Sequence, residues 1–393
     1  MELINTKYED GILTIGLKGH IDSANAAQVE KEITEAWGQY PGSSIIVDCS
    51  DLEYISSAGL RVILRLRKQD SELKVTNVSS EVYEIFDMTG FTEMMEITKA
   101  YRKISVEGCE VVGEGANGKV YRIDPDTIVK VYRNPDSLPD IKRERELART
   151  ALILGIPTAI PYDVVKVGEG YGSVFELLNA TSFAKIIAQD NSRIDEIVEL
   201  AVDLLKKIHG TVVKEGAMPQ MKSVAVKWVT FLKDYLPQAE YEKFLRMTQE
   251  VPELPNMLHG DYHLKNVMLQ NGEVLLIDMD TLCTGHPVFE FASIFNAYQG
   301  FSELNHQIIQ DFQGISYETG GEIWQKILHL YFAGKSEEEI QKIADKAKLI
   351  GYARIMRRSI RRGGLDSAEE KALIESCRRH IIDLLATTDS LVF

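Results

Sequence analysis

Two short stretches near the N-terminus alternate apolar and polar residues, and each is followed by apolar positions at helical spacing. Residues 11–19, "GILTIGLKG", and 44–50, "SIIVDCS", have the two-residue period of strands. The helix between them is expected to begin at Asp22 or Ser23, because both are good capping residues. Its inward positions are Ala26, Val29, Ile33 and Trp37.

The same order of strands and helices continues to about residue 100. A second helix is expected from Ser56 or Ser57, followed by a strand at 74–78, "KVTNV". A third helix is expected in 80–90, "SEVYEIFDMTG", and its last residue is a glycine that favours a helix end. This alternation predicts an α/β domain over residues 1–100.

The length and composition favour two domains. A chain of 393 residues with 45% apolar residues exceeds what one core usually organises. The strand pattern resumes near residues 99–104, so we expect domains at 1–100 and 101–393.

Charge and cysteine content exclude several functional classes. A net charge of -15 and a pI near 5.1 argue against nucleic-acid binding, which depends on basic side chains. The four cysteines form no C-x-x-C pair, so a disulfide framework or a zinc site is not expected. The N-terminal stretch is acidic, and no apolar run approaches the ~18 residues of a membrane span. We therefore expect a cytoplasmic protein that does not bind a membrane.

The second domain opens with three glycines and a lysine in a strand pattern. Gly113, Gly115 and Gly118 form G-x-G-x-x-G, which in a dinucleotide-binding fold would open a helix. Here a β-like segment follows instead, then an Asp-Pro-Asp turn and the stretch 127–133, "TIVKVYR", which contains Lys130. A glycine hairpin followed by a lysine strand is typical of kinases, where the backbone approaches the phosphates of ATP.

Acidic and backbone partners for the nucleotide are expected next along the chain. Glu144 lies on the apolar stripe of a predicted helix and is the preferred partner of Lys130, with Glu146 as the alternative. The following strand, 170–180, resembles a kinase hinge, in which backbone groups of Glu176 and Leu178 would contact an adenine edge.

A second polar cluster, "HGDYHLKN" at 259–266, lies between two apolar runs. Phosphoryl transfer needs a carboxylate that accepts the proton of the attacking hydroxyl, and Asp261 fits this role. Asn266 and Asp278 are oxygen donors suited to Mg²⁺. The segment between them predicts a hairpin with an Asn-Gly turn, which would bring the two side chains together.

The first domain resembles the STAS domain of bacterial anti-sigma factor antagonists. The resemblance rests on 48–68, "DCSDLEYISSAGLRVILRLRK", and on 85–91, "IFDMTGF". It implies an anti-sigma factor or another STAS-binding protein as partner. In that family a serine at this helix start is phosphorylated, and alignment of D-S-S-G-L implies Ser57 here, although Ser56 and Ala58 replace an Asp and a Ser. The alternative is that these serines only cap a helix.

The second domain resembles the two-lobed α+β fold of protein kinases, with lobes at about 101–180 and 181–393. Within that fold it is similar to aminoglycoside phosphotransferases and choline kinases, because His263 stands where protein kinases usually have lysine and no A-P-E segment follows. The chain departs from the antibiotic kinases at "TGHPVFEFA", where His286 and Glu290 replace two aspartates. His259 fits both a loop-supporting role and that of a core histidine.

An arginine-rich stretch follows in the helical C-terminal region. It is either a solvated helix face or a dock for an anionic acceptor or for the acidic STAS domain. Its arginines are Arg354, Arg357, Arg358, Arg361 and Arg362.

These observations predict an ATP- and Mg²⁺-dependent phosphotransferase that acts on a small-molecule hydroxyl and carries a STAS regulatory domain. A protein Ser/Thr kinase of a partner-switching pathway, acting on Ser57 itself, is the first alternative. A nucleotide-binding scaffold without turnover is the second. His263 argues against the first alternative, and the complete set of Asp261, Asn266 and Asp278 argues against the second.

Overall fold

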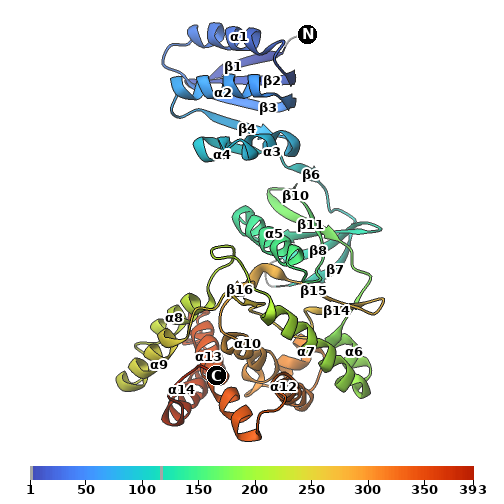
Figure 1. The fold of residues 1–393 in the computed structure, drawn as a ribbon, viewed down its shortest axis with the longest axis vertical. Coiled ribbons are helices and arrows are strands. Elements are labelled where there is room, and N and C mark those ends of the chain that lie inside the picture. The colour runs from blue at the N-terminus through green and yellow to red at the C-terminus, as the bar shows by residue number, and fades with distance from the viewer. Residues whose placement is uncertain (1–2, 116–117) are drawn as a thin grey trace. The chain divides into compact units, whose positions relative to one another are not determined.

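The computed structural model describes residues 3–115 and 118–393, which form two compact units (Figure 1). The first unit comprises Met1–Ser105 with Val164–Glu169, and the second comprises Val106–Asp163 with Gly170–Phe393. None of the described helices is both long enough and apolar enough to cross a membrane.

The first unit is built on a five-stranded sheet of order β1-β2-β3-β4-β5. The first pair of strands is antiparallel and the others are parallel. Alternate residues of β2 are fully buried, which is the pattern expected of a sheet with one face on the core. The strands are β1 Ile4–Glu9, β2 Ile12–Ile21, β3 Ser44–Ile55, β4 Lys74–Val78 and β5 Glu96–Lys99.

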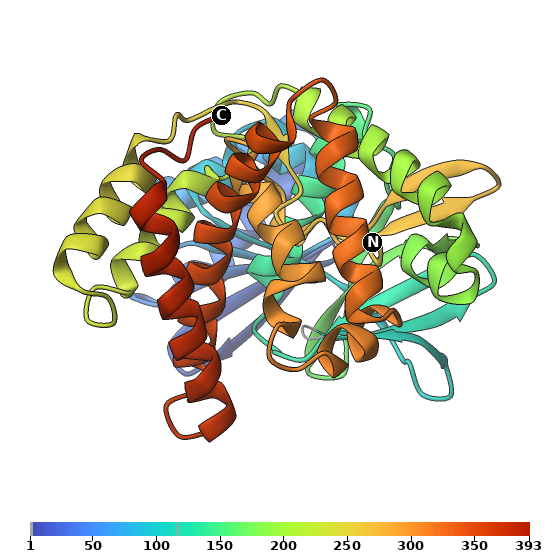
Figure 2. The ribbon, with the colours of Figure 1, turned by 90° about the horizontal axis from the view of Figure 1, so that it is seen from below.

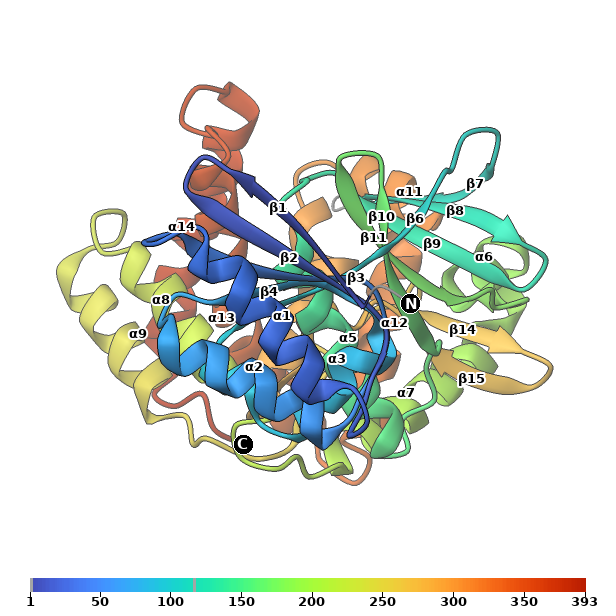
Figure 3. The ribbon, with the colours of Figure 1, turned by 90° about the horizontal axis from the view of Figure 1, so that it is seen from above.

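Four helices complete this unit, and α1 and α2 lie side by side on one face of the sheet (Figure 3). Ser56 caps α2 by accepting a hydrogen bond from the N–H of Ala58, which confirms the predicted start. The predicted cap of α1 is wrong, because Asp22 accepts from the N–H of Ala24 in a turn and the helix begins only after Asn25. The helices are α1 Ala26–Gly38, α2 Ser57–Gln69, α3 Ser80–Met88 and α4 Phe91–Met94.

Six further strands form a sheet of order β6-β10-β11-β9-β8-β7. Antiparallel pairing of β7, β8 and β9 confirms the predicted glycine hairpin and lysine strand. Helix α5, Leu138–Ile153, contacts β11 of this sheet. The strands are β6 Arg102–Ile104, β7 Glu110–Glu114, β8 Gly118–Asp124, β9 Thr127–Tyr132, β10 Pro161–Val167 and β11 Gly170–Glu176.

The rest of the second unit is mainly helical and packs around α10. All but one residue of α10 are buried, so this helix is the centre of the core. The two long helices α13 and α14 lie side by side (Figure 2). The helices are α6 Phe183–Gln189, α7 Ile194–Gly210, α8 Met221–Phe231, α9 Gln238–Glu250, α10 Val288–Tyr298, α11 Gln307–Gln313, α12 Tyr317–Tyr331, α13 Glu337–Arg361 and α14 Ala368–Thr387.

Short strands and 3-10 turns carry the polar cluster of this lobe. The hairpin of β14 and β15 turns at Asn271 and Gly272, both with positive φ, which confirms the predicted Asn-Gly turn. The strands are β12 Thr181–Ser182, β13 Met257–Leu258, β14 Val267–Gln270, β15 Glu273–Leu276 and β16 Cys283–Thr284. The 3-10 turns are η1 Asn191–Arg193, η2 Met279–Thr281 and η3 Gly300–Ser302.

Candidate active site

The glycine hairpin is closed by backbone contacts. The N–H of Gly115 donates to the carbonyl of Gly118 over 3.0 Å. A Cβ on Gly118 would lie 2.1 Å from the carbonyl oxygen of Val131, so only glycine allows this approach of β8 to β9. A Cβ on Gly115 would meet nothing within 4 Å, whereas one on Gly113 would lie 3.7 Å from Val120. Residues 116 and 117 of the motif lie outside the described part of the chain.

Lys130 joins three segments of the second unit. Its Nζ lies 2.9 Å from Oε1 of Glu144 on α5 and 3.3 Å from Oδ1 of Asp278, which follows β15. The Glu144 side chain is only 6% exposed and also accepts a hydrogen bond from the hydroxyl of Tyr132, whereas Glu146 is exposed. Burial opposes the charge of Lys130, yet the two carboxylates hold its pKa above the usual range. Of the two glutamates left open by the sequence, Glu144 therefore contacts the lysine.

The predicted hinge follows the end of β11. The N–H of Glu176 donates to the carbonyl of Ile160 over 3.2 Å, so that donor is already used. The N–H of Leu177 donates to the carbonyl of Asp126 over 2.7 Å. Any contact of Glu176 with an adenine edge would therefore use its carbonyl, and the contribution of Leu178 stays a prediction.

The loop from 259 to 266 holds Asp261 and Asn266 together. The amide nitrogen of Asn266 donates to the carbonyl of Asp261 over 3.1 Å, which leaves the amide oxygen for another ligand. His259 is fully buried; its Nδ1 accepts from the N–H of Asp261, and its Nε2 lies 3.2 Å from the carbonyl of Ile277. This pair of contacts fits one neutral tautomer. His259 is thus a buried residue that also supports the loop.

Glu290 on α10 holds the same loop by hydrogen bonds to its backbone. Its carboxylate is fully buried and accepts hydrogen bonds from the N–H groups of His259 and Gly260, the latter over 3.0 Å. Gly260 has a φ of +80°, and a Cβ there would lie 2.5 Å from the carbonyl of Thr281. The sequence identified Glu290 only as a departure from the antibiotic kinases, and its spacing gave no indication of this contact.

Arg354 and Ser293 were not predicted as neighbours of Asp261. One guanidinium nitrogen of Arg354 lies 3.3 Å from Oδ1 of Asp261, and the other donates to the hydroxyl of Ser293 over 3.0 Å. The same carboxylate faces Nε2 of His263 at 3.6 Å. Burial would raise the pKa of Asp261, but the nearby His263 and the charge of Arg354 hold it well below its usual range.

The donors predicted for a metal are brought close by the β14–β15 hairpin. The N–H of Ile277 donates to the carbonyl of Asn266 over 2.9 Å, and Asp278 follows directly in a left-handed conformation with φ of +63°. Burial and the charge of Asp278 raise the pKa of Asp280 to about 7. The described residues contain no cluster of three His, Cys, Asp or Glu side chains able to hold a metal alone. Two protein oxygens with phosphate oxygens as further ligands suit Mg²⁺.

His286 replaces an aspartate of the antibiotic kinases and has a local structural role. Its Nδ1 accepts a hydrogen bond from the N–H of Val288 at the start of α10. Its ring lies 4.8 Å from the ring of Phe393, and burial lowers its pKa. The histidine therefore supports the start of the helix that carries Glu290.

Ser57 is exposed in the first turn of α2, next to the cap Ser56. The first turn packs closely on the sheet, because a Cβ on Gly59 would lie 2.7 Å from Ile55 and 3.0 Å from Ile21. Ser57 thus lies at the helix terminus where the sequence predicted it, and its modification stays a prediction.

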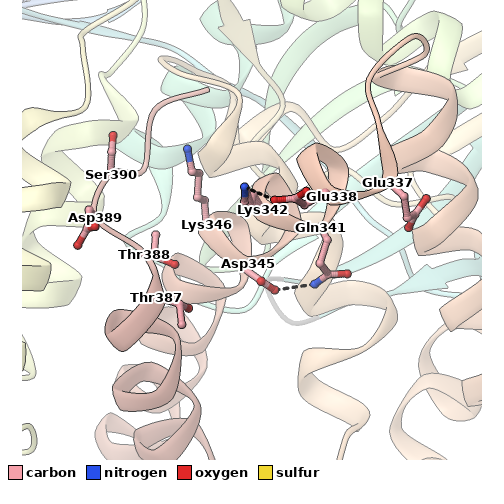
Figure 4. A pocket seen from close by; sticks show the side chains of 10 residues that line it. All are labelled: Glu337, Glu338, Gln341, Lys342, Asp345, Lys346, Thr387, Thr388, Asp389 and Ser390. Carbon is pink, nitrogen blue, oxygen red and sulfur yellow. Dashed lines mark hydrogen bonds and ion pairs between the residues drawn. The ribbon is translucent and has the colours of Figure 1, made fainter.

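A pocket between the first turns of α13 and the end of α14 contains none of the predicted site residues (Figure 4). Both signs of charge line it, and Lys342 pairs with Glu338 over 2.6 Å. A second pocket lies beside the lysine–glutamate pair and includes Tyr132, Arg143, Glu144 and Asp280.

The fold and the meeting of Lys130, Glu144 and Asp278 define a kinase-like phosphotransferase domain. Residues 108–323 match the model of the phosphotransferase enzyme family, and residues 4–104 match the STAS domain. The chain therefore belongs to the phosphotransferase enzyme family and carries an N-terminal STAS domain, which confirms both predicted resemblances.

Similar proteins are found for each unit separately. The protein of Bordetella bronchiseptica named "Putative anti-sigma factor antagonist BtrV" is 36% identical over 95 residues, which are 23% of this chain and 81% of that protein. The anti-sigma-B factor antagonist of Listeria monocytogenes is 30% identical over 89 residues, or 22% of this chain and 77% of that protein. The crystal structure of the aminoglycoside phosphotransferase APH(4)-Ia is similar with a TM-score of 0.50 and 11% identity, covering 71% of this chain and 93% of that one. At this identity the last similarity concerns the fold alone.

Proposed function

We propose that this protein transfers the terminal phosphoryl group of ATP to a hydroxyl of a small molecule. The observation that carries the proposal is the contact of one Nζ, that of Lys130, with both Glu144 and Asp278. This contact links the strand, the helix and the carboxylate that phosphoryl transfer requires in the kinase fold. The family match supports the reaction class.

The sheet lobe would bind the nucleotide. The hairpin of Gly113, Gly115 and Gly118 lets the backbone approach the phosphates, and Lys130, oriented by Glu144, neutralises them. The carbonyl of Glu176 and the N–H of Leu178 would contact the adenine edge.

Asn266 and Asp278 would hold Mg²⁺ beside the phosphates. The amide oxygen of Asn266 is left free by the bond of its nitrogen to Asp261, and Asp278 is 44% exposed on the side of Lys130. When bound, the cation would neutralise the charge that develops on the phosphoryl group.

Asp261 would orient the acceptor hydroxyl and accept its proton. Its side chain is 38% exposed, and its pKa lies below the usual range, so the carboxylate is ionised at neutral pH. A small acceptor is favoured over a protein, since His263 occupies the position where protein kinases usually have lysine.

Measurement of ATP consumption with a panel of alcohols tests the proposal. Asp261→Asn should lose turnover by about 10²-fold or more while it retains Mg-ATP binding, because the proton acceptor is removed and the nucleotide contacts remain. Asp278→Ala should lose both turnover and Mg-ATP binding. Calorimetric titration reports the binding, and thermal unfolding controls for folding. Full turnover by the Asp261→Asn protein would show that this assignment is wrong.

A second function is favoured by the exposed Ser57 in the STAS domain. We propose that this domain binds a partner protein, such as an anti-sigma factor, and that phosphate on Ser57 changes this surface. A charge of about -1.5 to -2 would be tolerated at a helix start. Intact mass after incubation with Mg-ATP measures the modification, with Ser57→Ala and Asp261→Asn as controls. Label in the Asp261→Asn protein would indicate a contaminating kinase.

A further inference from the structure

Three arginines in the C-terminal half of α13 lie over aromatic rings, and the first of them, Arg354, contacts Asp261. The guanidinium carbons of Arg354, Arg357 and Arg358 lie 5.6, 5.7 and 4.8 Å from the ring centroids. Because the three are spaced three and four residues apart, they occupy one face of the helix. The rings belong, in the same order, to Trp228, Phe231 and Phe301.

This face carries positive charge that the nearby carboxylates balance only in part. Arg354 contacts Asp261, but neither Arg357 nor Arg358 forms an ion pair with a carboxylate in residues 3–115 or 118–393. Burial and the neighbouring arginines lower the pKa of both, although the charges of Glu370 and Asp261 oppose this at Arg358. The first half of the same helix differs, because Lys342 pairs there with Glu338 and Lys348 with Asp345.

Two of the three arginines differ from those of a solvated helix face. Arg354 has a side chain only 26% exposed and Arg357 is half-buried against its ring, whereas Arg358 is exposed and lies over the ring of Phe301. A guanidinium that stacks on a ring is held in place, and its planar N–H groups remain directed outward for a bidentate anion. The whole chain carries a charge of -15, so this cluster is opposite in sign to the rest of the protein.

We infer that the acceptor is a small alcohol that also carries a phosphate or carboxylate group, which Arg357 and Arg358 bind while its hydroxyl meets Asp261. This inference rests on the proposed phosphotransferase function. Arg357 and Arg358 follow Arg354 by one helical turn, or about 5.4 Å, so a hydroxyl and an anionic group a few carbons apart would span the distance. The same arginines would repel a polycation such as an aminoglycoside.

Pairs of acceptor alcohols that differ in charge test whether the site prefers an anionic acceptor. ATP consumption is measured with glycerol and glycerol 3-phosphate, ribose and ribose 5-phosphate, glycerate, choline and kanamycin. Turnover should be confined to phosphorylated or carboxylated compounds, each at least about tenfold better than its neutral partner. Preferred turnover of a neutral or cationic alcohol would overturn the inference but leave the phosphotransferase function intact. If the protein bound Mg-ATP but turned over none of these alcohols, the proposed phosphotransferase function would be contradicted.

A direct binding measurement keeps the inference testable whichever acceptor reacts. Glycerol 3-phosphate and ribose 5-phosphate are titrated into protein saturated with Mg²⁺ and a non-hydrolysable ATP analogue. The double variant Arg357→Gln/Arg358→Gln should bind them about 10- to 100-fold more weakly, as expected for lost charge-assisted hydrogen bonds. Lys342→Gln removes a charge from the same helix and should leave the affinity unchanged. Equal affinity of the double variant and the wild type, or no detectable binding to either, would overturn the inference.

Discussion

The nucleotide side and the acceptor side of the candidate site are built in different ways. Lys130 and Glu144 are 14 residues apart and belong to consecutive elements, β9 and α5. The groups that hold Asp261 come from much further away, with Ser293 32 residues and Arg354 93 residues along the chain. The lysine–glutamate pair of the nucleotide side is therefore encoded locally, although Asp278 joins it from 148 residues away, whereas the contacts of Asp261 with Ser293 and Arg354 depend on how α10 and α13 pack.

The two sides also differ in charge. Around Lys130 lie the carboxylates of Glu144, Asp278 and Asp280, and burial with the charge of Asp278 raises the pKa of Asp280 to about 7. A divalent cation would relieve the repulsion among these carboxylates. On the acceptor side the arginines of α13 lie beside Asp261, so an anion would be favoured there. The two halves thus favour ligands of opposite sign.

The largest effect is expected on the nucleotide side, from Lys130→Met. This change removes the cation near the phosphates and leaves the buried Glu144 without its ion pair. Affinity for Mg-ATP should fall by about 10- to 100-fold and turnover by about 10³-fold. Calorimetric titration and initial rates measure the two quantities.

Tyr132→Phe is the matched control. The Tyr132 hydroxyl, like Lys130, donates a hydrogen bond to Glu144, but it carries no charge that could neutralise a phosphate. The variant should lose about 1 kcal/mol of unfolding free energy and keep Mg-ATP affinity within a few-fold of the wild type. If both variants lost affinity equally, the role of Lys130 would be only to hold Glu144.

A smaller effect is expected from Glu290→Gln, which loosens the acceptor side without touching the nucleotide. The amide keeps one acceptor oxygen but places an NH₂ group against the N–H of His259 or Gly260. Turnover should fall by about 10²-fold and the unfolding free energy by about 1–3 kcal/mol, with Mg-ATP affinity unchanged. Denaturant unfolding and titration separate these quantities.

Glu303→Gln controls for the loss of a carboxylate elsewhere in the same lobe. Glu303 pairs with His380 over 2.9 Å and does not contact the 259–266 loop. Its replacement should leave turnover unchanged. Loss of Mg-ATP affinity in Glu290→Gln would show that the two sides are not independent.

The difference between the sides explains what the sequence could predict. Gly118, Lys130 and the Asn-Gly hairpin belong to short motifs whose geometry is fixed by neighbouring residues, so their pairings were predicted correctly. The role of Glu290 was missed, because nothing in its spacing indicates that a carboxylate on a buried helix accepts two N–H groups of a distant loop.

The arginine-rich stretch of α13 shows the same limit of prediction from sequence. Helical spacing predicted a charged helix but left open whether its face met solvent or a ligand. Contact with Trp228 and with Asp261 depends on the packing of α13 against α8 and α10. The predicted cap of α1 was wrong for a related reason, since Asp22 forms a local turn that competes with the helix start.

The smallest effect is expected from Arg354→Gln, which tests the contact between α13 and Asp261. The ionised carboxylate is the active form, so activity falls as pH drops through its pKa. Burial raises this pKa, whereas His263 and Arg354 lower it below the usual range. Loss of Arg354 should therefore move the acid limb of kcat/KM to higher pH, while turnover near pH 7 falls by about tenfold or less. A pH profile measured with an alcohol identified in the acceptor screen tests this, and Arg361→Gln, on the exposed end of the helix, is the control. An unmoved acid limb with reduced affinity for the acceptor would mean that Arg354 binds substrate and leaves the ionisation of Asp261 unchanged.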